Sequence, residues 1–176
     1  MSQPYPLECI CVHRAEPCQL RFLEEASRFL SPRLDRAVAP SDRGLVVSAE
    51  TETALARAIE VLKIIYGDEL GVGEFMIRYR RGAVVEEPHM GVRVQCIASH
   101  FQTVMDDLIA RGAAIYDAEL APPLGVVRAT ASLAKLLGYA QHLAELTDAR
   151  AREVMWLSHY APVERPRRTP DLLARR

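Results

Sequence analysis

The sequence predicts an α+β protein in which the element order βαββαβ occurs twice along the chain. In each half, short apolar runs typical of strands alternate with segments whose apolar residues recur every three or four positions, as on one face of a helix. This order is that of the ferredoxin-like split βαβ domain, a four-stranded antiparallel sheet with two helices on one face. The chain of 176 residues has the length of two such units in tandem.

The first half begins with the apolar run 7–13, which is predicted to be a strand. A helix is expected over 17–30, because Pro17 suits a first helical turn. The next helix is expected to begin at a cap on Thr51 or Thr53, since either hydroxyl can accept a bond from the first turn. The remaining strands of this half are expected at 34–39, 45–49 and 74–80.

The second half follows a short connector, 83–88, and repeats the order. Ser132 is the expected cap of its second helix. The elements expected here are strands at 91–98, 113–120, 126–131 and 153–160, and helices at 100–111 and 132–146. We therefore expect one domain over 1–84, a second over 85–163, and an Arg-rich flexible tail over 164–176.

Composition and charge exclude several classes of protein. Acidic and basic residues nearly balance, 23 against 22, so the chain has no overall field that would attract DNA. No apolar run has the roughly 20 residues that a membrane span needs, and the N-terminus lacks the pattern of a secretory signal. A cytoplasmic protein with no membrane partner is expected. Its basic residues are mostly Arg, which suits phosphate and carboxylate recognition, although GC-rich coding sequence produces the same bias.

No motif in the sequence indicates a catalytic or cofactor site. The glycine-rich phosphate loops, the GxSxG nucleophile elbow and the HExxH zinc motif are all absent, and the five His are scattered. The adjacent carboxylates of Asp106 and Asp107 fall on a predicted helix, where neighbours point in different directions and do not share a proton. We therefore expect no enzymatic activity and no cofactor.

The cysteines allow more than one interpretation. Cys9 and Cys11 share one face of the first predicted strand, close in sequence to Cys18, and thiolates bind zinc. Structural zinc sites, however, generally use CxxC turns in two pairs, so we interpret Cys9 and Cys11 as small apolar core residues. Zinc binding, or a redox role for a single thiol such as Cys96, is the alternative.

The second half contains glycine, tyrosine and histidine at specific spacings. The motifs are Leu136-Leu137-Gly138-Tyr139-Ala140, Leu143, Leu146-Thr147, Arg150-Ala151 and Ser158-His159-Tyr160-Ala161-Pro162-Val163, preceded by Glu87-Pro88-x-Met90. They resemble domain V, the C-terminal domain, of bacterial elongation factor G and its tetracycline-resistance relatives. That family reads roughly L-F-G-Y-A-T-D-L-R-S-L-T-Q-G-R-A and then F-S-H-Y-x-P-V. The resemblance covers 87–163.

The first half resembles domain III of the same factors. Residues 46–52 lie where the family has I-S-G-M-G-E-L-H-L-E, and 72–80 resemble V-G-x-P-x-V-x-Y-R-E. The sequence shows no resemblance to the family's GTPase domain or β-barrel domain II. Only the connector 81–87 stands where the family inserts domain IV. The resemblance thus implies domains III and V joined directly, with no means of hydrolysing GTP.

This resemblance implies a non-enzymatic protein that binds the ribosome at the factor site, near the stalk base and the sarcin–ricin loop of rRNA, or modulates translation there. The residues expected to contact rRNA or a partner are Arg128, Arg150, Arg152, His142, His159 and Tyr160. Asp148-Ala149 replaces the family's Q-G, and loss of that glycine changes the backbone permitted there. Two alternatives stay open: a ferredoxin-like scaffold reused as a protein-interaction subunit, and a small-molecule binder at the crevice between the units.

Overall fold

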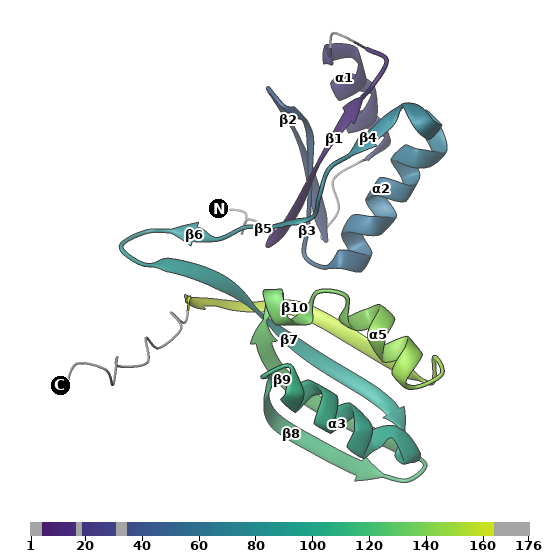
Figure 1. Cartoon of the computed structure of the whole chain (residues 1–176), viewed down its shortest axis with the longest axis vertical. Coiled ribbons are helices and arrows are strands. Elements are labelled where there is room, and N and C mark those ends of the chain that lie inside the picture. The colour runs from purple at the N-terminus through teal and green to yellow at the C-terminus, as the bar shows by residue number, and fades with distance from the viewer. Residues whose placement is uncertain (1–4, 17–18, 31–34, 164–176) are drawn as a thin grey trace, which may run out of the picture.

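The computed structural model describes residues 5–16, 19–30 and 35–163. These residues form two five-stranded sheets, and helices pack on one face of each (Figure 1). The strand orders are β2-β3-β1-β4 and β10-β7-β9-β8, so both units have the same arrangement. The predicted class, α+β with two tandem ferredoxin-like units, is confirmed. No described helix is long and apolar enough to cross a membrane.

The first unit is built around β1, in which every second side chain is buried. Leu7, Cys9, Cys11 and His13 point into the core, where α1 and α2 cover the sheet. Thr51 caps α2, since its hydroxyl accepts a hydrogen bond from the Ala54 N–H at 3.2 Å. The elements are β1 (Leu7–His13), α1 (Leu20–Phe29), β2 (Arg36–Ser41), β3 (Gly44–Ala49), α2 (Glu52–Tyr66), η1 (Gly67–Glu69), β4 (Leu70–Val72) and β5 (Met76–Ile77).

The last strand of this unit corrects the prediction of a strand over 74–80. The chain turns back directly after α2 through η1, so that β4 already pairs with the end of β1. The strand then breaks before β5, which pairs with Leu7 and Glu8 at the start of β1. Phe75 and Tyr79, whose alternation suggested the strand, are 38% and 45% exposed. The alternation of Phe75 and Tyr79 therefore does not correspond to a buried face of a strand.

The second unit has a longer and more regular sheet. Its central strand, β7, pairs with β10 on one side and β9 on the other, and α3, α4 and α5 cover one face (Figure 1). The elements are β6 (Arg80–Arg81), β7 (Val85–Ile97), η2 (Ala98–His100), α3 (Phe101–Ala110), β8 (Ala114–Ala121), β9 (Leu124–Ser132), α4 (Leu133–Leu136), α5 (Tyr139–Leu146) and β10 (Ala151–Pro162).

Two predicted features of the second unit are corrected. The connector at 83–88 is the turn and second strand of a hairpin, because β6 pairs with Val85 and Glu86 at the start of β7. The single helix expected over 132–146 is two helices, because Gly138 adopts a left-handed backbone with φ of 71°. Ser132 precedes the first of them but makes no side-chain capping bond.

Tyr139 fills the centre of the second core. Its ring is fully buried beneath Arg111, whose guanidinium lies 5.1 Å from the ring centroid. Its hydroxyl has no hydrogen-bond partner among the described residues. Burial, with a further contribution from the nearby Asp107 carboxylate, raises the pKa of this phenol.

Tyr139→Phe is therefore expected to preserve or increase stability at neutral pH, by about 1 kcal/mol, because it removes a buried and unpaired hydroxyl. The folded pKa lies above the unfolded value of about 10, so the wild type loses stability as pH rises through that value. Titration of Tyr139 lowers the free energy of unfolding of the wild type by up to about 1.4 kcal/mol per pH unit, whereas the variant has no phenol at this position and does not show this decrease. Urea unfolding of both proteins between pH 7 and 11 checks this. If the free energy of unfolding changed with pH in the same way for both proteins, the prediction would be wrong.

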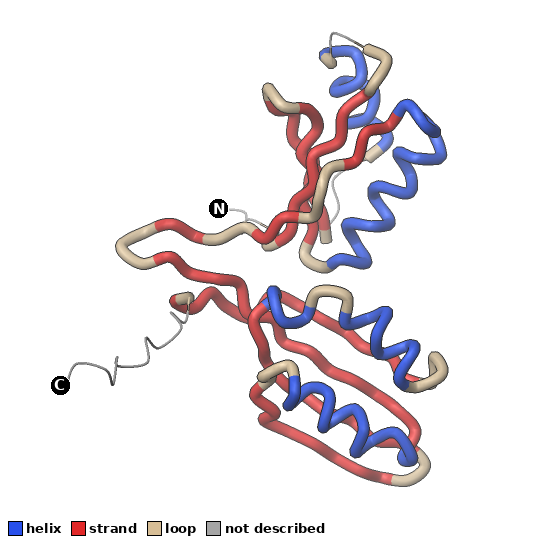
Figure 2. Tube along the Cα trace, in the orientation of Figure 1, coloured by secondary structure: helices blue, strands red, loops and turns tan. Residues whose placement is uncertain are grey.

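The two units meet through the loop between β3 and α2. The Glu50 carboxylate accepts a hydrogen bond from the Leu157 N–H at 2.9 Å, and the Glu52 carboxylate accepts one from the Gly138 N–H at 2.7 Å. Leu157 lies on β10, an edge strand of the second sheet, beside a bulge, and Gly138 separates α4 from α5. Figure 2 shows this loop facing the α4–α5 link. We call these two bonds the interunit contacts.

Candidate nucleic-acid interface

One face of the second sheet is left open by the described helices. Buried residues alternate along β7 and β9 with residues that point the other way, and those others, apart from Gly91 and Ser132, are partly or fully exposed. We call this surface the open face. Its members are Gly91, Arg93 and Gln95 on β7, Val126, Arg128 and Thr130 on β9, Arg152, Val154, Trp156 and His159 on β10, and Asp117 and Glu119 on β8.

Trp156 lies flat against the middle of the open face. It pairs across the strands with Gly91, and a Cβ added to Gly91 would meet the indole ring at 2.4 Å. Only the absence of a side chain at Gly91 lets the ring lie this close to the sheet. The indole nevertheless stays 37% exposed. One side of the ring is thus supported by backbone, and part of it is available to another molecule.

Three arginines lie on the open face to one side of this ring. Arg93 and Arg128 lie directly opposite one another on neighbouring strands, and Arg152 lies opposite Gln95 one row further along. Arg128 forms an ion pair with Asp117 on β8. For Arg93 and Arg152, the described part of the chain provides no side-chain ion pair or hydrogen bond. A directly opposed pair of like charges destabilises a sheet, and a bound anion would relieve the repulsion.

Two imidazoles extend the open face beyond Trp156. His89 and His159 pair across β7 and β10 with ring centroids 5.1 Å apart and planes inclined by 26°, so they are stacked. Glu87 lies 3.8 Å from His89. The face therefore carries aromatic surface and positive charge on β10, β7 and β9, with carboxylates at Asp117 and Glu119 on β8 and at Glu87 beside His89 on β7.

The structure brings three of the six predicted contact residues together. Arg128, Arg152 and His159 all belong to the open face. Tyr160 points away from it, because side chains alternate along β10, and its ring lies 3.8 Å from the Arg80 guanidinium. Burial raises the pKa of the Tyr160 phenol.

The other two predicted residues lie elsewhere in the second unit. His142 is on α5, on the helical side of the sheet, and its Nε2 lies 3.0 Å from Asp107. Asp107 also pairs with Arg111 at 3.0 Å, whereas Asp106 accepts a bond from Gln102. The two adjacent carboxylates thus have separate partners, as predicted. Arg150 is exposed in the loop that leads into β10.

The loop before β10 retains the backbone that the family's glycine would suit. Asp148 and Ala149 both have positive φ, 48° and 57°. The loop is held by the Ala149 N–H, which bonds to the Ala144 carbonyl at 2.7 Å, and by the Arg150 N–H, which bonds to the Thr147 carbonyl at 2.9 Å. Ala149 therefore adopts a backbone that glycine would suit and bears the steric cost of a left-handed conformation.

Ala149→Gly is expected to raise the free energy of unfolding by about 1 kcal/mol, since glycine adopts positive φ without the contact between Cβ and the carbonyl. Chemical denaturation followed by tryptophan fluorescence measures this in the second unit, because Trp156 is the single Trp of the chain. Ala144→Gly, in the regular part of α5, is the matched control and is expected to destabilise. A loss of stability in Ala149→Gly would contradict the prediction.

Sequence reasoning missed Trp156, Gly91 and Arg93. The signal that could have found them is the alternation of β7, in which Val92, Val94 and Cys96 form the buried side. That alternation assigns Gly91 and Arg93 to the opposite side. The position of Trp156 over Gly91 required the pairing register of β10, which pattern alone does not fix.

The cysteines are core residues, as we interpreted them. Cys9, Cys11 and Cys96 are buried, and the Cys9 thiol lies 3.2 Å from the Gly73 carbonyl. Burial raises the pKa of the Cys96 thiol, which disfavours the reactive thiolate. Cys18 lies outside the described residues. Within the described ranges, no group of three His, Cys, Asp or Glu is arranged to bind a metal ion.

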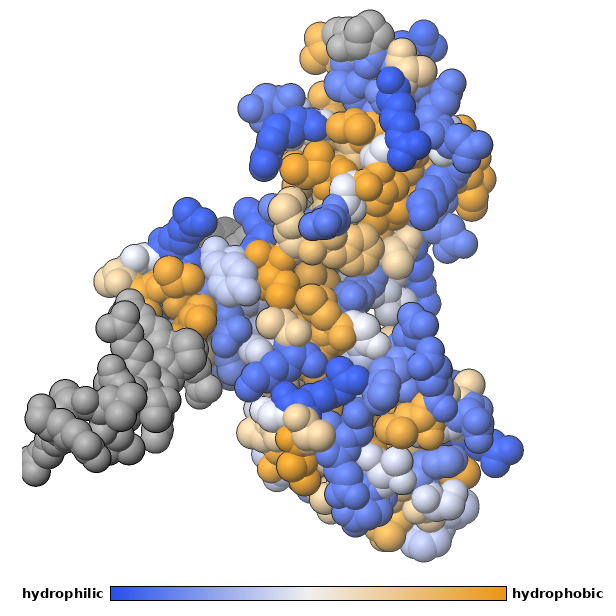
Figure 3. All heavy atoms as spheres, viewed as in Figure 1, coloured by the Kyte–Doolittle hydropathy of each residue, from blue (hydrophilic) through white to orange (hydrophobic). Residues whose placement is uncertain are grey.

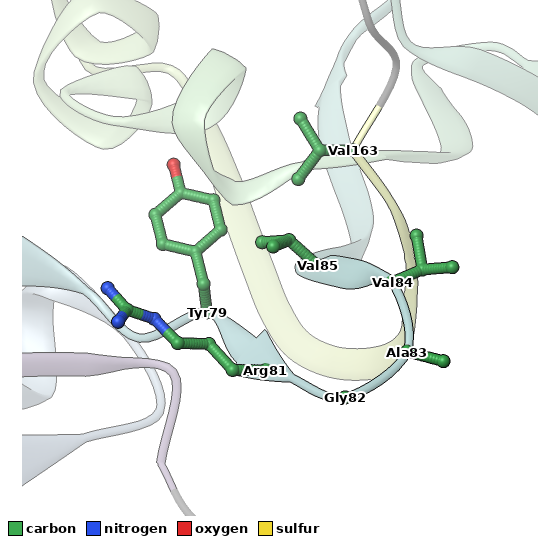
Figure 4. A pocket seen from close by; sticks show the side chains of 7 residues that line it. All are labelled: Tyr79, Arg81, Gly82, Ala83, Val84, Val85 and Val163. Atoms are coloured by element: carbon green, nitrogen blue, oxygen red, sulfur yellow. The ribbon is translucent and has the colours of Figure 1, made fainter.

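A shallow pocket of about 760 Å³ lies at the β6–β7 hairpin. It is lined by Tyr79, Arg81, Gly82, Ala83, Val84, Val85 and Val163 (Figure 4). Figure 3 shows hydrophobic side chains gathered on this projecting hairpin. Arg81 is its one charged lining residue, so the pocket lacks the several convergent polar groups that orient a small ligand.

Comparisons with known proteins agree with this architecture. Residues 84–169 match the family model described as elongation factor G C-terminus. Over 78 residues the chain is 35% identical to elongation factor G of Ureaplasma parvum serovar 3 and, equally, of Ureaplasma urealyticum serovar 10. That stretch is 44% of this chain and 11% of either factor, so the chain matches only a small part of those proteins.

A solved structure from Thermus thermophilus shares the fold of both units. It superimposes with a TM-score of 0.60 at 17% sequence identity and covers 93% of this chain and 42% of its own. The resemblance predicted from the sequence is thus confirmed: the second unit is similar to the C-terminal domain of elongation factor G.

Proposed function

We propose that this chain is a non-enzymatic protein that binds the ribosome at the factor site and modulates translation there, because its second unit is similar to the elongation factor G C-terminus. The match over 84–169 is the observation that carries the proposal. We further propose that 1–84 corresponds to domain III and 85–163 to domain V. The cytoplasm, where ribosomes work, is then its place of action.

Features of the described residues support this proposal. The β6–β7 hairpin joins the units directly, so the described residues between them contain no counterpart of the domain IV that the family inserts there. The interunit contacts tie two backbone groups of the second unit to the first. Exposed arginines, on the open face and at Arg150, are the side chains suited to phosphate.

Sedimentation with 70S ribosomes through a sucrose cushion tests the proposal. The purified full chain is expected to pellet with ribosomes at low and at physiological salt, and elongation factor G is expected to displace it. If the chain pellets with ribosomes but elongation factor G does not displace it, its binding site lies elsewhere on the ribosome. No pelleting at either salt would refute the proposal and leave the resemblance as one of fold.

Arg150→Ala is expected to weaken ribosome binding by about tenfold, the scale of one lost charge-assisted hydrogen bond. It should also reduce the steepness with which affinity falls as salt rises, because one phosphate contact fewer releases fewer counterions. Arg57→Ala, which removes an exposed Arg from α2 of the first unit, is the matched control. Equal affinities for wild type and Arg150→Ala would remove Arg150 from the binding site.

A protein-interaction subunit is the second candidate, favoured by the apolar side chains of the hairpin. Tyr79, Val84 and Val85 are 45%, 56% and 48% exposed, and all three line the pocket at this projection. Exposed apolar groups that gather in one place are typical of protein contacts. Affinity capture from the source cell, comparing wild type with Val84→Asp, would recover a partner that depends on the hairpin if this candidate is correct.

A further inference from the structure

We propose that the open face of the second sheet binds unpaired RNA nucleotides, with a base stacked on Trp156 and the backbone phosphates held by Arg93, Arg128 and Arg152. The assignment of RNA rests on the proposed function, whereas the assignment of a stacking, anion-binding surface rests on the geometry alone. This site is separate from the Arg150 loop and from the hairpin pocket.

The position of Trp156 is suited to stacking. Gly91 lets the indole lie directly on the backbone of β7, so the ring is held in the plane of the sheet. A ring in that plane presents its π surface outward, and 37% of the residue is exposed. Bases that stack on such aromatic side chains contribute much of the affinity of proteins for single strands.

The stacked imidazoles of His89 and His159 continue the same surface. They occupy the pair of positions next to Trp156 and Gly91 along β10 and β7, beyond the bulge at Leu157. Trp156 and the imidazole stack therefore lie next to one another along the strand direction. Because the two imidazoles stack on each other, Trp156 is the ring whose face is open to a base.

The arginines provide the complementary charge. Arg93 faces Arg128 across the strands, and within the described residues Arg93 has no acidic partner. Because Arg128 is ion-paired with Asp117, Arg93 is the arginine of this pair whose charge is not compensated among the described residues. A phosphate beside Arg93 would supply the missing negative charge. Asp117 and Glu119 lie on β8, away from the Trp156 side, and Glu87 lies on β7 beyond the imidazole pair.

An unpaired strand fits this surface better than a duplex. In a duplex the faces of the bases are stacked inside the helix and are not available to an indole, whereas unpaired bases can be splayed onto an aromatic platform. The open face is also a sheet without a described element above it. A protein partner would use the apolar part of the face, Val154 and Trp156, and this possibility is an outcome of the test below.

Tryptophan fluorescence measures the interaction directly, because Trp156 is the single Trp of the chain. The full chain is titrated with short single-stranded oligouridine and oligoadenosine RNA, with DNA of the same sequences, and with duplex RNA. Single-stranded RNA is expected to quench the fluorescence in a saturable manner, and duplex RNA is expected to quench it little. Equal or stronger binding of duplex RNA would overturn the stacking role. Preference for DNA would overturn the assignment of RNA.

Variants separate stacking from charge, with binding followed by anisotropy of a fluorescein-labelled RNA. Trp156→Ala is expected to lose about tenfold or more in affinity, and Trp156→Phe, which keeps a stacking ring, is expected to lose less. Arg93→Ala is expected to weaken binding and to lower the slope of log affinity against log salt by about 0.7. Arg57→Ala is the control of equal charge change. Unchanged affinity in both Trp156→Phe and Trp156→Ala, each shown to be folded by circular dichroism, would overturn the proposal.

Two further measurements keep the alternatives distinct. Sedimentation equilibrium of wild type and Trp156→Ala would detect a dimer formed through the open face, and a dimer that the variant abolishes would overturn RNA binding there. Ribosome pelleting of the wild type tests the proposed function separately. If ribosomes are bound but oligonucleotides are not, the open face is refuted and the proposed function stands. If oligonucleotides are bound but ribosomes are not, the proposed function fails and the stacking surface stands.

Discussion

Gly44→Ala is expected to lower the free energy of unfolding of the first unit by about 3 kcal/mol or more. Gly44 begins β3 with φ of 131°, a conformation that side chains rarely adopt. An added Cβ would also lie 2.5 Å from the Cys11 carbonyl oxygen and 2.7 Å from a Val12 methyl group. Both effects act together, because the backbone oxygen belongs to the central strand of the sheet and cannot move aside.

Hydrogen–deuterium exchange with mass spectrometry checks this prediction separately in each unit. The amides of β1 and β3 are expected to lose protection in Gly44→Ala, while those of β7 and β9 keep theirs. Gly82→Ala is the control, because a Cβ at Gly82 would meet nothing closer than 3.9 Å. Wild-type protection of β1 and β3 in Gly44→Ala would show that the sheet tolerates the side chain.

Gly138→Val is expected to destabilise the second unit by about 2 kcal/mol. Close packing of the helix is not the reason, since a Cβ at Gly138 would meet no atom within 4 Å. The cause is instead the left-handed backbone, φ of 71°, which a β-branched residue strongly disfavours. The same backbone points the Gly138 N–H at Glu52, so its loss also weakens an interunit contact.

Urea unfolding followed by Trp156 fluorescence measures this loss. Gly138→Asn is the informative control, because asparagine tolerates the left-handed region and places its side chain in the open space. It is expected to be close to wild type. If Gly138→Asn were as unstable as Gly138→Val, the backbone explanation would be wrong and contact with a side chain would have to be the cause.

The architecture of both units could be predicted from sequence because hydrophobic periodicity reports burial. The strand at 7–13 and the cap at Thr51 follow from local patterns, and the structure has both. The strand at 74–80 failed because Phe75 and Tyr79 alternate without facing a core. The break at Gly138 could not be seen because apolar spacing on either side of it, from Leu133 to Leu143, is that of one continuous helix.

The candidate interface was only partly accessible from sequence. Arg128, Arg152 and His159 were singled out, yet nothing local shows that they share a face with Arg93 and Trp156. That grouping depends on the pairing register of β7, β9 and β10, and these strands are far apart in the sequence. The bulge beside Leu157 shifts this register and brings His159 opposite His89. The His89–His159 stack is therefore a product of tertiary structure.

The interunit contacts have a consequence for how the chain would engage a large partner. The carboxylates of Glu50 and of Glu52, which begins α2, accept hydrogen bonds from two separate backbone groups of the second unit, and this limits movement of one unit on the other. A partner that contacts both the first unit and the open face of the second would bind one chain at two sites, so that binding at one site raises the effective concentration at the other. The chain would bind bivalently and would prefer partners in which the distance between the two contact sites matches the distance between its units.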